Sequence, residues 1–142
     1  MKNITAKGYS LLELLIVLAI ITIVSSLAYP TYTASAKKLQ RLEAKSALLT
    51  LQNNYERYFI TYNTYEKAKI GAGEKSILKN PITKDGSYSL EITEQSTDYY
   101  LLTATPHSKP AKKDKECASF TLSSLGEKGI TGTGSTYRCW NH

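Results

Sequence analysis

Residues 9–29 read YSLLELLIVLAIITIVSSLAY, an apolar stretch that separates the chain into an N-terminal helix and a more polar remainder. As a helix, about twenty such residues span roughly 30 Å, which matches the hydrocarbon core of a bilayer. Glu13 is the only ionisable side chain between Leu11 and Leu27. A carboxylate is costly to place in hydrocarbon, so a retained Glu13 needs a partner.

Length and composition limit the rest of the chain. The 142 residues allow a single domain with one modest core. An apolar content of 42% argues against a mostly disordered chain, and two cysteines exclude a disulfide-dense small scaffold. Because many of the aliphatic residues lie in the N-terminal run, the remainder is more polar than the average indicates.

A conventional secretory signal is one interpretation of the N-terminus. Lys2 and Lys7 would form its basic region, residues 14–28 its apolar region, and Ala34-Ser35-Ala36 its cleavage site. Cleavage after Ala36 would release a soluble binding module.

The sequence KGYSLLE at residues 7–13, followed by an apolar run that ends at Pro30, resembles the type IV prepilin signal. Members of that family have a short basic leader, Gly before the cleaved bond, an aromatic first mature residue, Glu as the fifth and Pro as the twenty-second. Counted from Tyr9, Glu13 and Pro30 occupy those two places. The family usually begins with Phe and Thr, whereas this chain has Tyr9 and Ser10.

The resemblance implies a role for each of these residues. A membrane prepilin peptidase would cleave after Gly8 and N-methylate the new amine of Tyr9. Glu13 would pair with the amine of a neighbouring subunit and set its register in the filament, since opposite charges in an apolar core attract strongly. Pro30 is expected to bend or locally break the helix, because proline removes a backbone donor and clashes with the preceding turn.

After Pro30 the apolar residues recur at spacings of three and four, which predicts that the helix continues with an amphipathic second half. The apolar stripe consists of Leu48, Leu51, Tyr55, Tyr58 and Tyr62. Charged residues are expected mostly on the other faces, namely Lys37, Lys38, Arg41, Glu43, Lys45, Glu56 and Arg57.

The helical pattern ends at Asn63-Thr64 and 71–73, where a loop of about twenty residues opens. Asn80-Pro81 and Asp85-Gly86 then mark turns.

Residues 87–92 alternate strictly between apolar and polar types, which predicts a half-buried strand, and 99–105 and 119–122 are the next two candidates. Three or four antiparallel strands on the helix stripe give an α+β head. Its expected core residues are Tyr88, Leu90, Ile92, Leu102, Phe120 and Leu122.

Cys117 and Cys139 enclose a glycine-rich segment. In an exported chain these two cysteines indicate one disulfide, and closing a loop of this size stabilises by about 3 kcal/mol. A cytosolic head would keep them reduced. This end resembles the disulfide-closed C-terminal region of type IV pilins. Several segments also resemble the PilE-like minor pilins of gamma-proteobacteria: 56–58, 100–106, 117–122, 126–129 and 139–140.

The distribution of basic residues predicts a different orientation of the head from the one that a disulfide indicates. Only Lys2 and Lys7 precede the apolar run, whereas four basic residues follow it within twenty residues, so a positive-inside count places the head in the cytosol. The prepilin-like cleavage site and the cysteines favour the opposite orientation, with the head in the periplasm.

Neither a catalytic constellation nor a metal site is evident. His107 and His142 are single histidines, and no pair of Cys or His residues has the spacing of metal ligands. No glycine-rich loop has the phosphate-binding pattern. We therefore expect no enzyme activity and no cofactor.

A basic loop is the remaining functional feature. Lys109, Lys112, Lys113 and Lys115 crowd a proline-containing segment, and eleven tyrosines are available for stacking. Such a patch could capture DNA through its phosphates or contact a surface. The alternative is that the lysines are solvated surface and the tyrosines belong to the core.

The resemblance predicts a type IV pilin fold, a long helix with a transmembrane first half on a small antiparallel sheet. Residues 1–8 would be the leader, 9–32 the membrane and filament-core helix, and 33–142 the globular head. The function implied is that of a minor pilus subunit that supports assembly, twitching motility and surface attachment.

The implied partners are other major and minor pilins, the prepilin peptidase and the inner-membrane assembly platform. The chain would lie in the inner membrane before it enters the extracellular pilus. A major pilin and a DNA-binding competence pilin remain alternatives, distinguished by abundance in sheared filaments and by salt-dependent DNA retention. A type II secretion pseudopilin is less favoured, because of the predicted disulfide and the absence of a calcium-type acidic loop.

Overall fold

The computed structural model describes residues 10–141, except for the side chain of Leu27. The chain divides into two units, residues 1–35 and 36–142. One helix, α1 (Leu11–Tyr62), passes from the first unit into the second. Residues 36–141 of the second unit form the head.

The part of α1 in the first unit is apolar on every side. The large aliphatic side chains between Leu11 and Val24 are 47% to 76% exposed. Its most apolar window has a mean hydropathy of 2.6 and no buried residue, so the helix is long and apolar enough to cross a membrane. Thr22 and Ser26 donate their hydroxyls to carbonyls three or four residues earlier in the helix. These polar groups are therefore satisfied without water.

Pro30 lies inside α1, and the helix continues through it without interruption. The hydroxyl of Thr33 donates to the carbonyl of Pro30 at 2.9 Å. Proline therefore does not break the helix here, and a bend at Pro30 stays a prediction.

The second half of α1 forms one wall of the head core. Four residues of the predicted stripe, Leu48, Leu51, Tyr55 and Tyr58, are at most 6% exposed. Tyr62 is 47% exposed, so the expectation for this residue is wrong. It is the last residue of α1, and its ring lies 4.5 Å from that of Tyr58 and 5.0 Å from the Lys75 ammonium.

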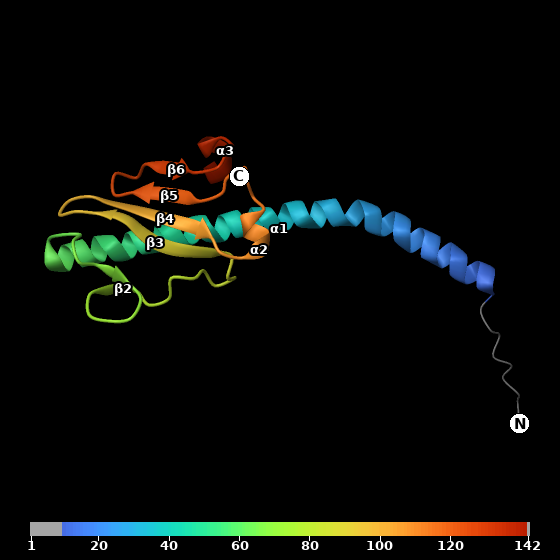
Figure 1. The fold of residues 1–142 in the computed structure, drawn as a ribbon, viewed down its shortest axis with the longest axis horizontal. Coiled ribbons are helices and arrows are strands. Elements are labelled where there is room, and N and C mark those ends of the chain that lie inside the picture. Colours follow the sequence, from blue (N-terminus) through green and yellow to red (C-terminus); the bar gives the residue numbers. More distant parts are fainter. Residues whose placement is uncertain (1–9, 142) are drawn as a thin grey trace, which may run out of the picture. The chain divides into compact units, whose positions relative to one another are not determined.

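Four strands form an antiparallel sheet in the order β3-β4-β5-β6, alongside the second half of α1 (Figure 1). The strands are β3 (Tyr88–Gln95), β4 (Tyr100–Pro106), β5 (Phe120–Ser123) and β6 (Lys128–Ile130). The first three confirm the predicted strands. In register, Leu90 pairs with Ala104, and Leu102 pairs with Leu122.

The inner face of this sheet completes the core. Five of the six predicted core residues are at most 5% exposed: Tyr88, Leu90, Leu102, Phe120 and Leu122. Ile92 is only partly buried, which corrects the expectation. The register of β3 on β4 shifts between Ile92 and Glu94, so the regular alternation ends at this position.

The segment between α1 and β3 is more ordered than the predicted loop. α1 ends before Asn63, which has φ of 51°. β1 (Lys69–Ile70) and β2 (Ser76–Leu78) then pair in parallel as a second sheet. Tyr65 anchors the segment, because its ring lies 4.7 Å from that of Tyr100 and is 8% exposed.

A polar cluster lies within this aromatic packing. The hydroxyls of Tyr65 and Tyr100 donate to the Glu56 carboxylate at 3.0 and 2.8 Å. Glu56, which the sequence placed outside the apolar stripe, is thus half-buried. Burial, together with the hydrogen bond to Glu56, raises the pKa of Tyr65 to about 12.

Two short helices complete the head and were not predicted. α2 (Lys109–Lys112) is capped by Ser108, whose hydroxyl accepts from the amide of Ala111 at 3.4 Å. α3 (Thr136–Asn141) carries the buried residues Cys139 and Trp140.

Candidate functional site

Glu13 lies in the first turn of α1, where its charge suits the positive end of the helix dipole. The side chain is exposed among exposed aliphatic residues. Within residues 10–141 no cation lies within ion-pair distance of it. Gly8 and Tyr9, the predicted cleavage and methylation sites, lie outside the described residues. The structure thus places a carboxylate within an exposed apolar helix surface.

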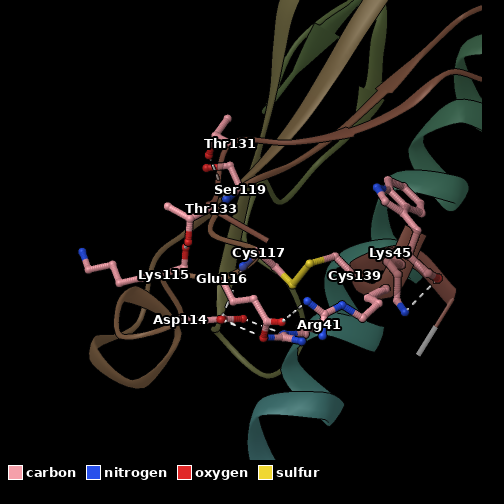
Figure 2. The surroundings of a disulfide bond; sticks show 12 residues. Arg41, Lys45, Asp114, Lys115, Glu116, Cys117, Ser119, Thr131, Thr133 and Cys139 are labelled. Carbon is pink, nitrogen blue, oxygen red and sulfur yellow. Dashed lines mark hydrogen bonds and ion pairs between the residues drawn. A yellow bond between two sulfur atoms is a disulfide. The ribbon is translucent and has the colours of Figure 1, made fainter. Parts of the chain in front are cut away.

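Cys117 and Cys139 form a disulfide, with their Cα atoms 5.8 Å apart and both side chains fully buried. This confirms the disulfide-closed C-terminal region. Trp140 lies beside it, and its indole donates to the carbonyl of Gly129 at 2.9 Å. The bridge therefore ties α3 to the segment that precedes β5 (Figure 2).

The backbone around the disulfide is tightly packed. Gly132 donates its amide to the carbonyl of Cys117 at 3.2 Å, and Gly134 donates to Glu116 at 2.8 Å. A Cβ atom on Gly132 would lie 2.2 Å from the Glu116 carbonyl oxygen. Only glycine permits this close approach, which fixes the backbone from which the basic loop emerges.

Arg41 of α1 binds two carboxylates of that loop, as Figure 2 shows. Its guanidinium donates to both oxygens of Asp114 at 2.7 and 2.8 Å and to Glu116 at 2.8 Å. The side chain of Arg41 is 15% exposed and that of Asp114 only 2%. Arg41 was expected among the charged residues outside the apolar stripe; the structure adds that it is largely buried, because a carboxylate 73 residues away turns inward to meet it.

The charges of this ion pair stabilise each other. The hydrogen bond to Asp114 raises the pKa of Arg41 even though burial opposes the charged form. Burial favours the neutral form of Asp114, but the hydrogen bond and charge of Arg41 outweigh it and hold the pKa of that carboxyl below its ordinary value. The pair is thus fully ionised near neutral pH.

Lys45 was also expected outside the apolar stripe, and it is only 8% exposed. Its ammonium donates to the carbonyl of Trp140 at 3.1 Å (Figure 2). Burial, and then the charge of Arg41, lowers the pKa of Lys45. One turn apart on α1, Arg41 and Lys45 therefore hold both ends of the disulfide-closed region.

The four predicted patch lysines lie together. Lys109 and Lys112 are on α2, Lys113 and Lys115 follow it, and all four are exposed. Lys115 points away from the Arg41 ion pair (Figure 2). Asp114 and Glu116 lie beside these lysines in the sequence, but both carboxylates face Arg41.

Among the described residues, most tyrosines of the head are buried in its core and are not available for stacking beside this loop. Five of the eleven are core residues: Tyr55, Tyr58, Tyr65, Tyr88 and Tyr100. Tyr137 on α3 is 70% exposed, and the adjacent Arg138 lies 4.0 Å from Glu116. Tyr137 and Arg138 are thus aromatic and basic groups near the loop that the sequence did not single out. Their only sequence signal is the proximity to Cys139.

Within residues 10–141, one group of acidic and sulfur side chains has ligand atoms within 4.8 Å of one another, namely Asp114, Glu116 and Cys117. The sulfur of Cys117 is in the disulfide, and both carboxylates bind Arg41. These groups are therefore committed to structural contacts and are not arranged for a metal ion.

Comparison with known proteins identifies several relatives. The type II secretion system core protein G of Pectobacterium carotovorum subsp. carotovorum is 26% identical over 145 residues, which cover 95% of this chain and 85% of that protein. The type IV major pilin protein PilE1 of Neisseria gonorrhoeae is 25% identical over 127 residues, which cover 89% and 67%.

Solved structures of two pilins are also similar. A type IV pilin from Shewanella oneidensis matches 75% of this chain and 99% of its own, with 22% identity and a TM-score of 0.48. The non-core minor pilin PilV of Neisseria meningitidis matches 68% and 91%, with 20% identity and a TM-score of 0.46.

Two family models match the chain. The prokaryotic N-terminal methylation motif matches residues 5–29. The family described as "Type IV minor pilin ComP, DNA uptake sequence receptor" matches residues 30–121, which is more than half of the 142 residues. The chain therefore belongs to the type IV pilin family, in the group of the type IV minor pilin ComP.

Proposed function

We propose that this chain is a minor subunit of a type IV pilus that supports pilus assembly, twitching motility and surface attachment. One observation carries the proposal: an α1 segment apolar on every side, with a single carboxylate, continues into a folded head of the minor pilin group. Residues 9–32 would serve first as membrane anchor and then as part of the filament core. The apolar surface would stay out of water in both states, so the transfer need not be prohibitive.

Assembly would proceed from the processed N-terminus. Prepilin peptidase would cleave the 1–8 leader after Gly8 and methylate Tyr9. Glu13 would then meet the Tyr9 amine of a neighbouring subunit, a pairing that both stabilises the two charges and sets the register. The inner-membrane platform and a separate cytoplasmic motor would drive extension.

The contacts of two basic residues, Arg41 and Lys45, support a periplasmic head. Arg41 and Lys45 belong to the four cations that follow the apolar run and give the opposite positive-inside count. Both are engaged inside the head, Arg41 with Asp114 and Lys45 with the Trp140 carbonyl. Because both side chains make contacts inside the folded head, neither would bind lipid headgroups at the cytosolic face of the membrane. The disulfide agrees with an oxidising compartment.

A peptidase-resistant leader tests the assembly role. In cells that carry Gly8→Val, we expect uncleaved protein to accumulate in the membrane, to be missing from sheared pili and to reduce twitching. Ala6→Val, two residues earlier in the leader, is the matched control and should behave as wild type. Normal piliation and motility with accumulated uncleaved Gly8→Val protein would contradict the proposal.

DNA capture for competence is a second candidate function. It is favoured by the exposed lysines of the 109–115 loop, whose neighbouring carboxylates are held by Arg41. The matching family model is that of a DNA uptake sequence receptor. A positive loop of this kind would bind phosphates and lose affinity as salt rises.

Salt-dependent DNA retention by the full-length protein in detergent tests this candidate. Changing Lys109, Lys112, Lys113 and Lys115 to Gln should reduce the salt slope by up to about 3.6, at about 0.9 for each lost phosphate contact. A control set of four exposed lysines elsewhere in the head, Lys67, Lys69, Lys79 and Lys84 changed to Gln, should retain the wild-type slope. Equal slopes in both sets would exclude the 109–115 loop as the DNA site.

A further inference from the structure

A groove in the head lies between α1 and the edge strand β6. It has a volume of about 360 Å³ and is lined on the α1 side by Leu42, Leu49 and Asn53, and on the other side by Lys128 and Trp140. Leu42 is 56% exposed and Leu49 44% exposed, although both belong to the helix that forms the core wall. The groove therefore has an apolar floor that no other part of the head covers.

Among the described residues, the charged side chains that line the groove are Lys45 and Lys128. Lys128 places its ammonium 5.3 Å from the centre of the Trp140 ring, and Lys45 also lines the groove. No Asp or Glu belongs to the lining residues. The charge of Lys128 contributes to the lowered pKa of Lys45, after burial and the charges of Arg41 and Lys38. Lys128 and Lys45 thus give the groove a positive charge, which suits an acidic partner.

The groove is bordered by an open sheet edge. β6 pairs with β5 on one side only and is the last strand of the sheet. The amide of Thr131 donates to the Ser119 carbonyl, and the amide of Ser123 donates to the Glu127 carbonyl. In an antiparallel pair the hydrogen-bonded residue pairs alternate, so the pair between them, Thr121 and Gly129, is also hydrogen-bonded. The backbone amides and carbonyls of Lys128 and Ile130 consequently point away from β5. Among the described residues they have no hydrogen-bond partner.

We propose that this groove receives an extended acidic segment from the head of a neighbouring pilin, which adds as a strand beside β6. This inference rests on the proposed function as a pilus subunit. The backbone of the incoming segment would bond Lys128 and Ile130, as in β-strand addition. Alternate side chains would reach the groove, where a carboxylate meets Lys128 and an apolar group covers Leu42 and Leu49. Such an acidic strand occurs in this chain itself, as β3 carries exposed Glu91 and Glu94.

Photo-crosslinking in piliated cells tests the inference with the full-length tagged protein. A benzophenone amino acid replaces Asn53, an exposed groove residue, or, as control, Thr105, an exposed β4 residue outside the groove. From sheared pili, we expect the Asn53 probe to join an acidic, non-helical segment of a pilin head. Lys128→Glu should lower that yield at least tenfold and Lys128→Arg should keep it, while the Thr105 products stay unchanged. Lys128 is exposed, and normal disulfide formation on a non-reducing gel confirms that these variants fold.

The possible outcomes separate the two proposals. If the tagged protein is missing from sheared pili, the proposed function fails, and this inference fails with it. If the protein is present but the Asn53 probe crosslinks only to an apolar helix or to a non-pilin protein, this inference alone is wrong. The same holds if Lys128→Glu leaves the crosslinking yield of the Asn53 probe unchanged. Hydrogen exchange adds a backbone readout: the Lys128 and Ile130 amides should exchange at least tenfold more slowly in pili than in detergent, and equal rates would exclude strand addition.

Discussion

At the residue scale, the contact between Arg41 and Asp114 shows how long-range pairing decides the role of a charged side chain. The sequence placed Arg41 outside the apolar stripe without identifying its partner, since local periodicity carries no information about a carboxylate 73 residues away. The same limit applies to Lys45, whose partner is the backbone of Trp140. By contrast, Cys117 and Cys139 could be paired from the sequence, because two cysteines in an exported chain leave one choice.

Stability should depend on pH through Asp114. Its pKa is below the ordinary value in the folded head, whereas the unfolded chain takes up the proton at about pH 3.9. Wild-type stability should therefore fall as the pH drops through about 4 and below. Asp114→Asn should cost about 3 kcal/mol at pH 7, because Arg41 loses its buried partner.

Thermal or denaturant unfolding of the full-length protein, followed by circular dichroism from pH 7 to pH 3, measures this effect. The gap between wild type and Asp114→Asn should narrow below about pH 4. Glu127→Gln, at an exposed residue without an ion pair among those described, is the control and should match wild type. A gap that is constant over the whole pH range would show that Asp114 does not titrate as described.

Glu13 gives a second prediction at this scale. Glu13→Gln keeps the side-chain shape but removes the charge, so a neighbouring amine in the filament core would lose its partner. We expect the variant to reach the membrane normally and to fall at least tenfold in sheared pili, measured by quantitative immunoblot. Thr22→Ala, in the same apolar helix, should assemble normally. Equal incorporation of Glu13→Gln and wild type would refute the register role.

At the element scale, periodicity predicted the parts of the head that pack on α1. The stripe from Leu48 to Tyr58 and the three longer strands follow from spacing alone. The sequence did not predict the shorter elements, namely β1, β2, β6, α2 and α3. Segments of two to six residues are too short to show a recurring pattern of apolar residues. Their positions depend on tertiary contacts, such as those of Tyr65 with Tyr100.

The stripe makes a direct stability prediction. Leu51 is fully buried, so Leu51→Ala should lower the free energy of unfolding by about 3 kcal/mol through lost burial and a cavity. Ile60 lies on the same helix and is 83% exposed, so Ile60→Ala should change stability by no more than about 0.5 kcal/mol. Similar losses in both variants, measured by denaturant unfolding, would contradict the packing of α1 described above.

The disulfide links elements that are far apart in the chain. Replacing Cys117 and Cys139 together by Ala should lower the free energy of unfolding by about 3 kcal/mol. This is the value expected for a disulfide whose cysteines are 22 residues apart in the sequence. The loss should appear in denaturant unfolding of the oxidised proteins. Under strong reductant, wild type should approach the double variant. Unchanged stability of the double variant would mean that Arg41 and Lys45 hold this region without the bridge.

At the scale of the whole molecule, the sequence predicted the division into an apolar helix and a polar head. The apolar run of residues 9–29 is recognisable because its hydrophobicity needs no tertiary context. The groove between α1 and β6 was not predictable, since it combines α1 residues with an edge strand more than 70 positions later. The exposure of Leu42 and Leu49 likewise appears only once the sheet has covered the opposite face of α1.

The N-terminus of the protein recovered from sheared pili tests the central claim most directly. Mass spectrometry and N-terminal sequencing should give a chain that begins at N-methylated Tyr9, with 134 residues left after the eight-residue leader is removed from 142. A chain in the filament that still begins at Met1, or a protein found only in the medium with Lys37 at its N-terminus, would contradict the assignment as a processed pilus subunit.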